Sequence, residues 1–509
     1  MENKTPLKNE LIKGSFWSFT TTLLAKIGGL ILTIILARYL LPDGFGLYSL
    51  AFSVAIVFVT FADLGINSAT IRYISQEITS NGKKVNSFLK YFLKLKIKVA
   101  LISSISLLVT SYFLSNFLFH KPELFLLLIF LSFYIFLISI DGFFESLLYI
   151  KNRVDLITFK EIIFQVLRIS FVFSAFLVLR KGLYLSGAIL SSVFSALFIF
   201  FILVFFCKNL FSFSEKSKVN LSKKEKKQIL HFIFFLTIAS LSGVFFSYFD
   251  TIILGIFLPN NFVGFYRSAI TLVISLAGLL SFTGVFLNVF AKVNKQNLQP
   301  FFDKILNALS IITIPLVVGM IILSRYVLVL IYGYEYLPAE GILIILSPLI
   351  FLFTISGMMA NFLSARNYAK KLAAITLSSL VLNLVLNLLF IKLLLPLSEL
   401  YATFGVAIAT VISWTFYFFF GLFIFKKELK INFRFKLLIK PFFASLVMGG
   451  AIYFFNYFYP TMNVFKGFTE VILGGIIYFT ILFLIKGIEK KDFLDIIPKF
   501  QTSTKLKYF

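Results

Sequence analysis

Long apolar runs, separated by short polar connections, form the main pattern along the 509-residue chain. A run of about 20 apolar residues is long enough to cross the hydrocarbon layer as a helix. The pattern therefore predicts an all-α integral membrane protein. We predict fourteen spans: 15–37, 46–66, 88–116, 123–146, 156–179, 182–206, 229–256, 262–290, 301–323, 340–362, 370–390, 402–425, 438–458 and 467–485.

The net charge of +26 has an uneven distribution that predicts the topology. Lys and Arg concentrate at the N-terminus, in the even-numbered connections and at the C-terminus, which is typical of cytoplasmic segments. The odd-numbered connections carry only seven of the 48: Arg38, Lys121, Arg180, Lys181, Arg325, Lys392 and Lys466. We therefore expect both termini in the cytoplasm and no nucleic-acid partner. One cysteine and two histidines also make a disulfide framework or a Cys/His metal site improbable.

The chain repeats a turn. LPDGFGLY at 41–48 resembles LPNNFVGFY at 258–266, with 217 residues between Pro42 and Pro259. HKPELFLLLIF at 120–130 resembles LPAEGILIILS at 337–347 at the same offset. Because this offset covers six spans, we predict two six-helix repeats in the same orientation and a final helix pair. The predicted domains are residues 1–210, 211–430 and 431–509, the last with a basic cytoplasmic tail.

Polar residues follow one face of the first two spans in each repeat. Buried polar groups are expensive in lipid unless they face a cavity or a partner. The stripes could line a cavity, or their small residues could only allow close helix packing. The stripes contain Ser18, Thr22, Lys26, Gly29, Thr33, Ser49, Ser53, Thr60, Asp63, Thr237, Ser240, Gly243, Ser247, Asp250, Arg267, Thr271, Ser275 and Gly278.

Three segments together resemble the Wzx-type polysaccharide flippases of the MOP/MATE exporter superfamily: ILARYLLPDGFGLYSLAFSV (35–54), YFDTIILGIFLPNNFVGFYRSA (248–269) and IYGYEYLPAEGILIIL (331–346). The resemblance covers nearly the whole chain. It implies two six-helix lobes around a central cavity that opens to one membrane face at a time. It also implies a cargo of lipid-linked oligosaccharide that moves from the inner to the outer leaflet of the cell membrane.

We single out three cations inside the spans as candidate substrate-binding residues: Lys26, Arg168 and Arg267. A cavity cation would lower the free energy of moving the phosphate or pyrophosphate of a polyprenyl-linked glycan across hydrocarbon. Lys26 could instead snorkel, and Arg168 could be neutralised by Glu161. Asp63 and Asp250 complete the candidate set, and we predict an ion pair between Asp250 and Arg267. A cytoplasmic ion-pair cluster is predicted from Asp141, Glu145, Lys151 and Arg153.

Other functions stay open. They are a lipid II-type precursor flippase, a multidrug or toxin antiporter, and a polysaccharide polymerase or ligase. Antiporters of this superfamily often carry a carboxylate on the first helix, where this chain offers only Lys26. An enzyme would need a large external loop, so we expect a transporter and no catalytic residues. No cofactor is expected; coupling to a proton or sodium gradient stays open, as does contact with polysaccharide polymerase machinery.

Overall fold

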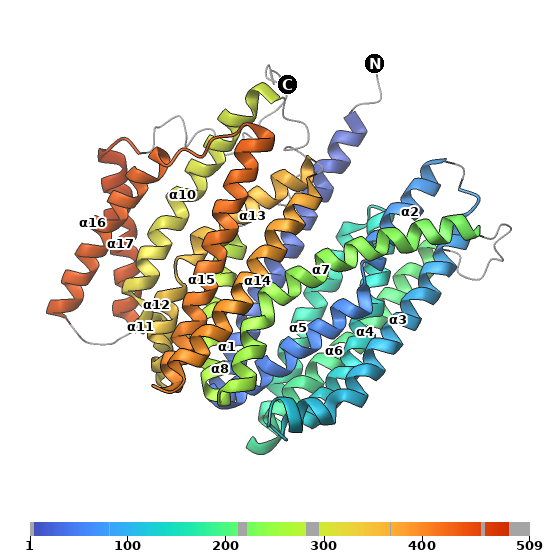
Figure 1. Ribbon diagram of the computed structural model, residues 1–509, viewed down its shortest axis with the longest axis horizontal. Helices are drawn as coiled ribbons and strands as arrows, with labels where there is room; N and C mark the ends of the chain where they lie inside the picture. Colours follow the sequence, from blue (N-terminus) through green and yellow to red (C-terminus); the bar gives the residue numbers. More distant parts are fainter. Residues whose placement is uncertain are drawn as a thin grey trace. The chain divides into compact units, whose positions relative to one another are not determined.

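The computed structural model describes residues 5–80, 82–211, 221–280, 295–366, 368–459 and 464–487. Within these stretches every regular element is helical, which confirms the all-α prediction (Figure 1). The α-helices are α1 (Thr5–Asp63), α2 (Ile66–Ser80), α3 (Val85–Phe113), α4 (Leu124–Ile150), α5 (Val154–Val178), α6 (Tyr184–Leu210), α7 (Lys223–Phe257), α8 (Asn260–Leu280), α10 (Leu298–Ile322), α11 (Ser324–Ile331), α12 (Glu340–Leu346), α13 (Leu349–Ala365), α14 (Ala369–Leu394), α15 (Glu399–Ile424), α16 (Lys436–Phe458) and α17 (Val464–Leu484).

The described residues contain 12 helices that are long and apolar enough to cross a membrane, or up to 13 if the bent pair Tyr334–Leu346 and Leu349–Ala365 is one span. One of them, Phe16–Ser80, is 65 residues long and covers the first two predicted spans. Apolar side chains such as Val109 and Phe201 face outward, as expected where lipid is the solvent. The chain is therefore a multi-pass membrane protein, although this count does not confirm the predicted fourteen spans.

The chain divides into two compact units. The first comprises Met1–Arg267 and Thr376–Val406, and in it α1, α3, α4, α5 and α6 pack side by side. Its core lies where Phe92, Phe143 and Leu203 meet. The second comprises Ser268–Ile375 and Ala407–Phe509, and in it α16 packs against α10 and α17.

Pro42 explains a sharp break within the long helix α1. The ring of a proline disfavours helical dihedrals at the residue before it. Leu41 has φ 58° and ψ 174°, which divides α1 into two helices at the place where the sequence predicts a turn. The corresponding turn between α7 and α8 has its helix C-cap at Leu258, which is extended (φ −125°, ψ 156°) and precedes Pro259.

The two repeated turns pack directly on each other within the first unit, through glycines. A methyl group added at Gly46 would lie 2.8 Å from both the carbonyl carbon of Asn260 and the amide nitrogen of Gly264. A methyl group at Gly264 would lie 2.9 Å from the carbonyl carbon of Pro42. The offset that relates Gly46 to Gly264 also relates Pro42 to Asn260. The contact is therefore reciprocal, since each turn places its glycine on the equivalent carbonyl of the other.

Candidate functional site

Lys26 lies in the first half of α1 and is exposed. It makes no hydrogen bond or ion pair with any residue that the structure describes. Two positions later, on the other side of the helix, Gly28 is buried against α5, where an added methyl group would lie 2.7 Å from the Cγ atom of Gln165. Packing against α5 thus occupies the Gly28 side of α1 and leaves the Lys26 ammonium accessible to an anion.

The small polar residues beside Lys26 satisfy their own hydrogen bonds. The Thr22 hydroxyl donates to the carbonyl of Ser18 at 2.9 Å, and the Thr33 hydroxyl donates to that of Gly29 at 2.8 Å. Such bonds to the preceding turn need no ligand. These contacts favour the helix-packing interpretation for Thr22 and Thr33, and they leave the Lys26 ammonium as a cation on this face without a partner among the described residues.

Arg168 is held by neutral groups from two neighbouring helices. Its Nε donates to Ser192 of α6, and its NH2 group donates to the hydroxyl of Tyr48 on α1, both at 3.1 Å. The guanidinium also lies over the ring of Phe52, 5.6 Å from the centroid, which is a favourable cation–π distance. Arg168 forms no direct ion pair with Glu161, which instead accepts a hydrogen bond from Gln165 at 2.7 Å, so neutralisation of Arg168 by Glu161 across Gln165 stays a prediction.

The predicted ion pair between Asp250 and Arg267 is not formed. Asp250 is 4% exposed and accepts hydrogen bonds from Tyr266 at 2.8 Å and from the Asn387 side chain at 2.7 Å. Arg267 instead lies over the ring of Tyr248, 5.6 Å from its centroid. Tyr266 directly precedes Arg267, so on the helix these two residues point about 100° apart and only one of them can face Asp250.

Asp63 forms an ion pair that the sequence did not suggest. Its Oδ1 atom lies 2.7 Å from the Nζ atom of Lys96, whose side chain is fully buried, whereas the Asp63 side chain is 32% exposed. Lys96 lies inside α3 but close to a basic connection. In the sequence its charge is therefore attributed to the excess of Lys and Arg in cytoplasmic connections. Within the described residues, no hydrogen bond or ion pair joins any two of the five predicted site residues.

The predicted ion-pair cluster at the end of α4 is not formed, because Glu145, Lys151 and Arg153 contact other groups. Arg153 pairs with Asp155 at 3.0 Å, and Lys151 lies over the ring of Phe211. Glu145 pairs instead with Lys160, a buried lysine of α5 that the sequence analysis missed. Lys151 and Arg153 are in the exposed turn after α4 and can reach water, which explains why they do not face the helix interior.

Lys121 lies in the connection before α4 and is buried, with 9% exposure. It donates to the carbonyl of Leu258 at 2.8 Å, at the C-terminal end of α7, where the helix dipole favours a positive charge. Desolvation lowers the pKa of Lys121 to about 8, and the nearby charges of Asp43 and Glu123 oppose this shift. The lysine therefore ties this connection to the second of the repeated turns.

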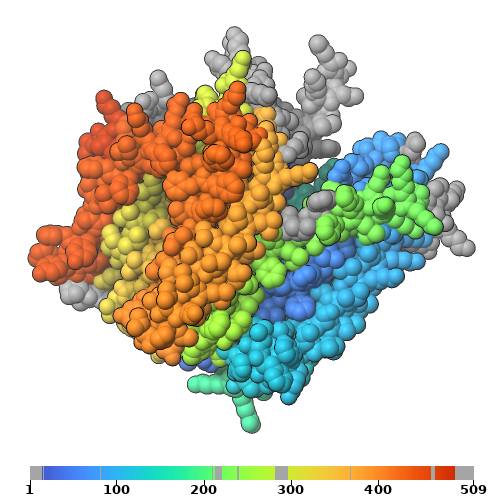
Figure 2. Space-filling model, viewed as in Figure 1, coloured from blue at the N-terminus to red at the C-terminus, as the bar shows by residue number. Residues whose placement is uncertain are grey.

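The opposite end of α7 is held by a surface ion pair. Lys84, between α2 and α3, lies 2.7 Å from Glu225, which also forms a capping box with Ser222 at the start of α7. The hydrogen bond from Lys84 is the main cause that lowers the pKa of Glu225 to about 2. Arg72 of α2 stacks on Phe232 at 4.5 Å. Figure 2 shows this part of α7, in green, between α2 and α3.

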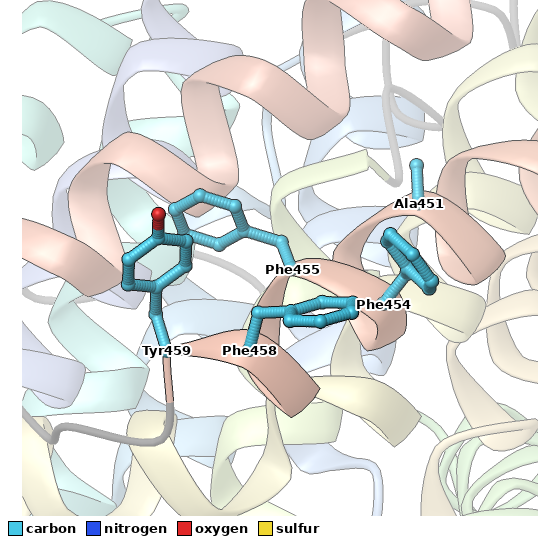
Figure 3. A pocket seen from close by; sticks show the side chains of 5 residues that line it. All are labelled: Ala451, Phe454, Phe455, Phe458 and Tyr459. Atoms are coloured by element: carbon cyan, nitrogen blue, oxygen red, sulfur yellow. The ribbon is translucent and has the colours of Figure 1, made fainter.

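The second unit carries an aromatic pocket at the end of α16 (Figure 3). Its lining consists of Ala451, Phe454, Phe455, Phe458 and Tyr459. Beside it, Lys466 lies over the ring of Phe455 and donates to Asn456 at 2.7 Å, while Glu470 lies 3.3 Å away. The lining holds no charged group and the neighbouring lysine already has a carboxylate, so this pocket suits an apolar group better than a phosphate.

Solved structures with similar folds are membrane transporters. A lipid II flippase, MurJ, in an inward closed conformation superposes with a TM-score of 0.72 at 19% identity, over 92% of this chain and 98% of that one. An inward-facing multidrug resistance MATE family transporter of the MOP superfamily gives 0.61 at 17% identity, over 80% and 95%. These likenesses define the class of the fold, which is that of the MurJ and MATE transporters.

The sequence comparisons identify the family. Residues 11–287 match the family model of polysaccharide biosynthesis proteins, and the chain belongs to that family. A relative in Haloferax volcanii, Agl15, is named as a probable low-salt glycan biosynthesis flippase and is 26% identical over 281 residues. The alignment covers 54% of this chain and 58% of that protein, so it spans little more than half the length of the relative.

Proposed function

We propose that this protein is a flippase that moves a polyprenyl-phosphate- or pyrophosphate-linked oligosaccharide from the inner to the outer leaflet of the cell membrane by alternating access. The observation that carries this proposal is the exposed Lys26, without an ion-pair partner among the described residues, on the polar face of α1. The family, the Haloferax volcanii relative and the transporter fold support it. In this proposal the protein is a transporter and not an enzyme.

The proposal assigns the Lys26 ammonium to the cargo phosphate. A hydrogen bond between charged groups contributes about 1.5–3 kcal/mol. The membrane potential supplies direction, since each negative charge that moves outward across the full field gains about 2.3 kcal/mol per 100 mV. Arg168 and Arg267, which contact neutral groups within the described part of the chain, are the further cations of the proposed cargo path.

The topology proposal keeps fourteen crossings, two six-helix repeats, a final pair α16–α17 and cytoplasmic termini. The break at Leu41 supports it, because it divides the 65-residue segment Phe16–Ser80 into two spans. The corresponding domains are residues 1–210, 211–430 and 431–509. Coupling to an ion gradient and contact with a polysaccharide polymerase belong to the same proposal.

Replacing Lys26 tests the function directly. Proteoliposomes would contain a fluorescent polyprenyl-pyrophosphate glycan, and a membrane-impermeant reagent would report the leaflet that it occupies. We expect Lys26→Ala to slow flipping about tenfold or more, from the lost charge-assisted bond, and Lys26→Arg to keep part of the rate. Lys98→Ala is the matched control, since Lys98 is also an exposed lysine within a helix. Flipping by Lys26→Ala at the wild-type rate would remove Lys26 from the cargo path.

A further inference from the structure

Lys160 joins two carboxylates, Glu145 of α4 and Glu161 of α5, in a network of ion pairs between these helices. Lys160, 6% exposed, pairs with Glu145 of α4 and lies 3.3 Å from Glu161. Gln165 donates to Glu161 at 2.7 Å. Arg168, one turn further along α5, is bound to neutral hydroxyl groups. Lys160 thus pairs with two carboxylates, and Arg168 acts on Glu161 only through its charge, without a direct bond.

Asp141 is the surplus acid of this network. It lies one turn before Glu145 on α4 and is 1% exposed. Neither of its carboxyl oxygens has a hydrogen-bond partner among the described residues. The nearest charges that act on it are Lys160 and Glu145, and Lys160 already has two carboxylate partners. An ionised Asp141 would therefore be a buried charge without compensation, which is strongly unfavourable at membrane depth.

Among the described residues, the charges that act on Asp141 are those of Lys160 and Glu145, and the other helices packed around α4 add none. On α3 and α1, Lys96 and Asp63 neutralise each other at 2.7 Å. Cys207 of α6 donates its thiol to the carbonyl of Phe144. On α2, the amide of Asn67 lies against Gly142, the residue next to Asp141. Among the described residues, no group of three or more His, Cys, Asp or Glu side chains could hold a metal ion.

We infer that Asp141 is a proton-binding site of the transport cycle, taking up and releasing one solvent proton. This inference rests on the proposed function, and it names the residue that would couple transport to protons. Proton uptake converts the carboxylate to the neutral acid, and release returns the proton to solvent. Glu145, one turn nearer the end of α4, has a 26% exposed side chain and offers the route to water.

The network connects the protonation of Asp141 to α1, the helix that carries Lys26. An ionised Asp141 competes with Glu145 and Glu161 for Lys160, so its deprotonation rearranges the ion pairs between α4 and α5. Glu161 holds Gln165, and the Gln165 side chain lies against Gly28 of α1. Lys26 is on the same helix two residues earlier. Release of the proton therefore shifts the contact that positions α1.

The protonation state is measured first, because it does not depend on transport. Infrared spectra of the purified full-length protein in lipid nanodiscs, titrated in pH, should show the carbonyl stretch of a protonated carboxylic acid. We expect Asp141→Asn to remove this band and Asp155→Asn to leave it unchanged. Asp155 is the matched control because it is a half-exposed aspartate paired with Arg153. An unchanged spectrum in Asp141→Asn, or a band that depends on sodium at constant pH, would overturn the inference.

A second measurement needs no variant. A hydrophobic carbodiimide reacts with protonated carboxyl groups in apolar surroundings, so wild-type protein should carry the label on the peptide that contains Asp141. Label on other acids only would contradict the inference. This readout also applies if Asp141→Asn does not fold.

A flipping assay then distinguishes a failure of this inference from a failure of the proposed function. In proteoliposomes, a pH gradient should accelerate glycan flipping by the wild type, whereas the rate of Asp141→Asn should be the same with and without the gradient. Equal acceleration of both proteins would overturn the role of Asp141 in coupling. If neither protein moves the glycan while the infrared band and its loss are observed, the proposed function fails and the proton site stands.

Discussion

The reciprocal contact between the repeated turns predicts that neither Gly46 nor Gly264 tolerates even an alanine. The first atoms that a new methyl group would meet are the backbone carbonyl oxygens of Asn260 and Pro42, which lie closer still than their carbonyl carbons at 2.8 and 2.9 Å, whereas ordinary contacts at such a position begin at 3.4 Å. No side-chain rotation relieves this overlap, so one turn has to move away from the other by at least about half an ångström. Overpacking of this kind typically destabilises by about 1–3 kcal/mol.

Equilibrium unfolding of Gly46→Ala, Gly264→Ala and the double variant in detergent micelles measures this effect. We expect each single change to lower the free energy of unfolding by about 1–3 kcal/mol. The double change should cost clearly less than the sum, because the first methyl group already parts the turns and neighbouring sites are coupled by about 0.5–3 kcal/mol. Gly243→Ala is the control, since an added methyl group there meets no atom within 4 Å.

Two results would refute the reasoning. Additive losses in the double variant would mean that the glycines act at separate contacts. Single variants as stable as Gly243→Ala would mean that the turns do not touch in the folded protein.

Three further predictions concern the charged groups. Asp63→Asn should lower the free energy of unfolding by about 3–5 kcal/mol, because Lys96 stays buried without its partner, and adding Lys96→Met should restore most of it. Lys121 has a folded pKa of about 8, below its ordinary 10.5, so the wild type should gain stability between pH 8 and 10.5 relative to Lys121→Met in thermal unfolding. Glu225 has a folded pKa of about 2, below its ordinary 4.5, so the stabilisation from its pair with Lys84 is present above pH 4.5 and lost towards pH 2; Glu225→Gln should lack this loss in acid unfolding curves.

The helices and the repeated turn could be predicted from the sequence because they depend on local composition. Pro42 and the apolar runs on both sides of it are sufficient for a break between two spans. The partner of Asp250 could not be predicted in this way. Asn387 follows it by 137 residues, and an apolar pattern says which residues are in lipid but not which helices are neighbours.

The charged groups show a second limit. Lys160 and Lys96 lie near basic connections, where the positive-inside pattern already accounts for a cation. The composition therefore does not show that these two lysines are buried. Lys151 and Arg153 were predicted to neutralise Asp141 and Glu145 because they are close in sequence. In the structure the helix end carries them into an exposed turn, and Glu145 takes its partner from α5.

The packing of one repeated turn on the other has a consequence for how such a chain could arise. A patch that contacts its own copy, residue for residue, is the isologous interface of a homodimer with two-fold symmetry. A single repeat carrying this turn could therefore pair with itself before the two copies were joined in one chain. Joining them frees each copy to diverge: Tyr48 now accepts a hydrogen bond from Arg168, whereas its counterpart Tyr266 donates one to Asp250. The fused chain can thus hold a cation on one side of an ancestral symmetry axis and an anion on the other, which a homodimer of identical subunits cannot do.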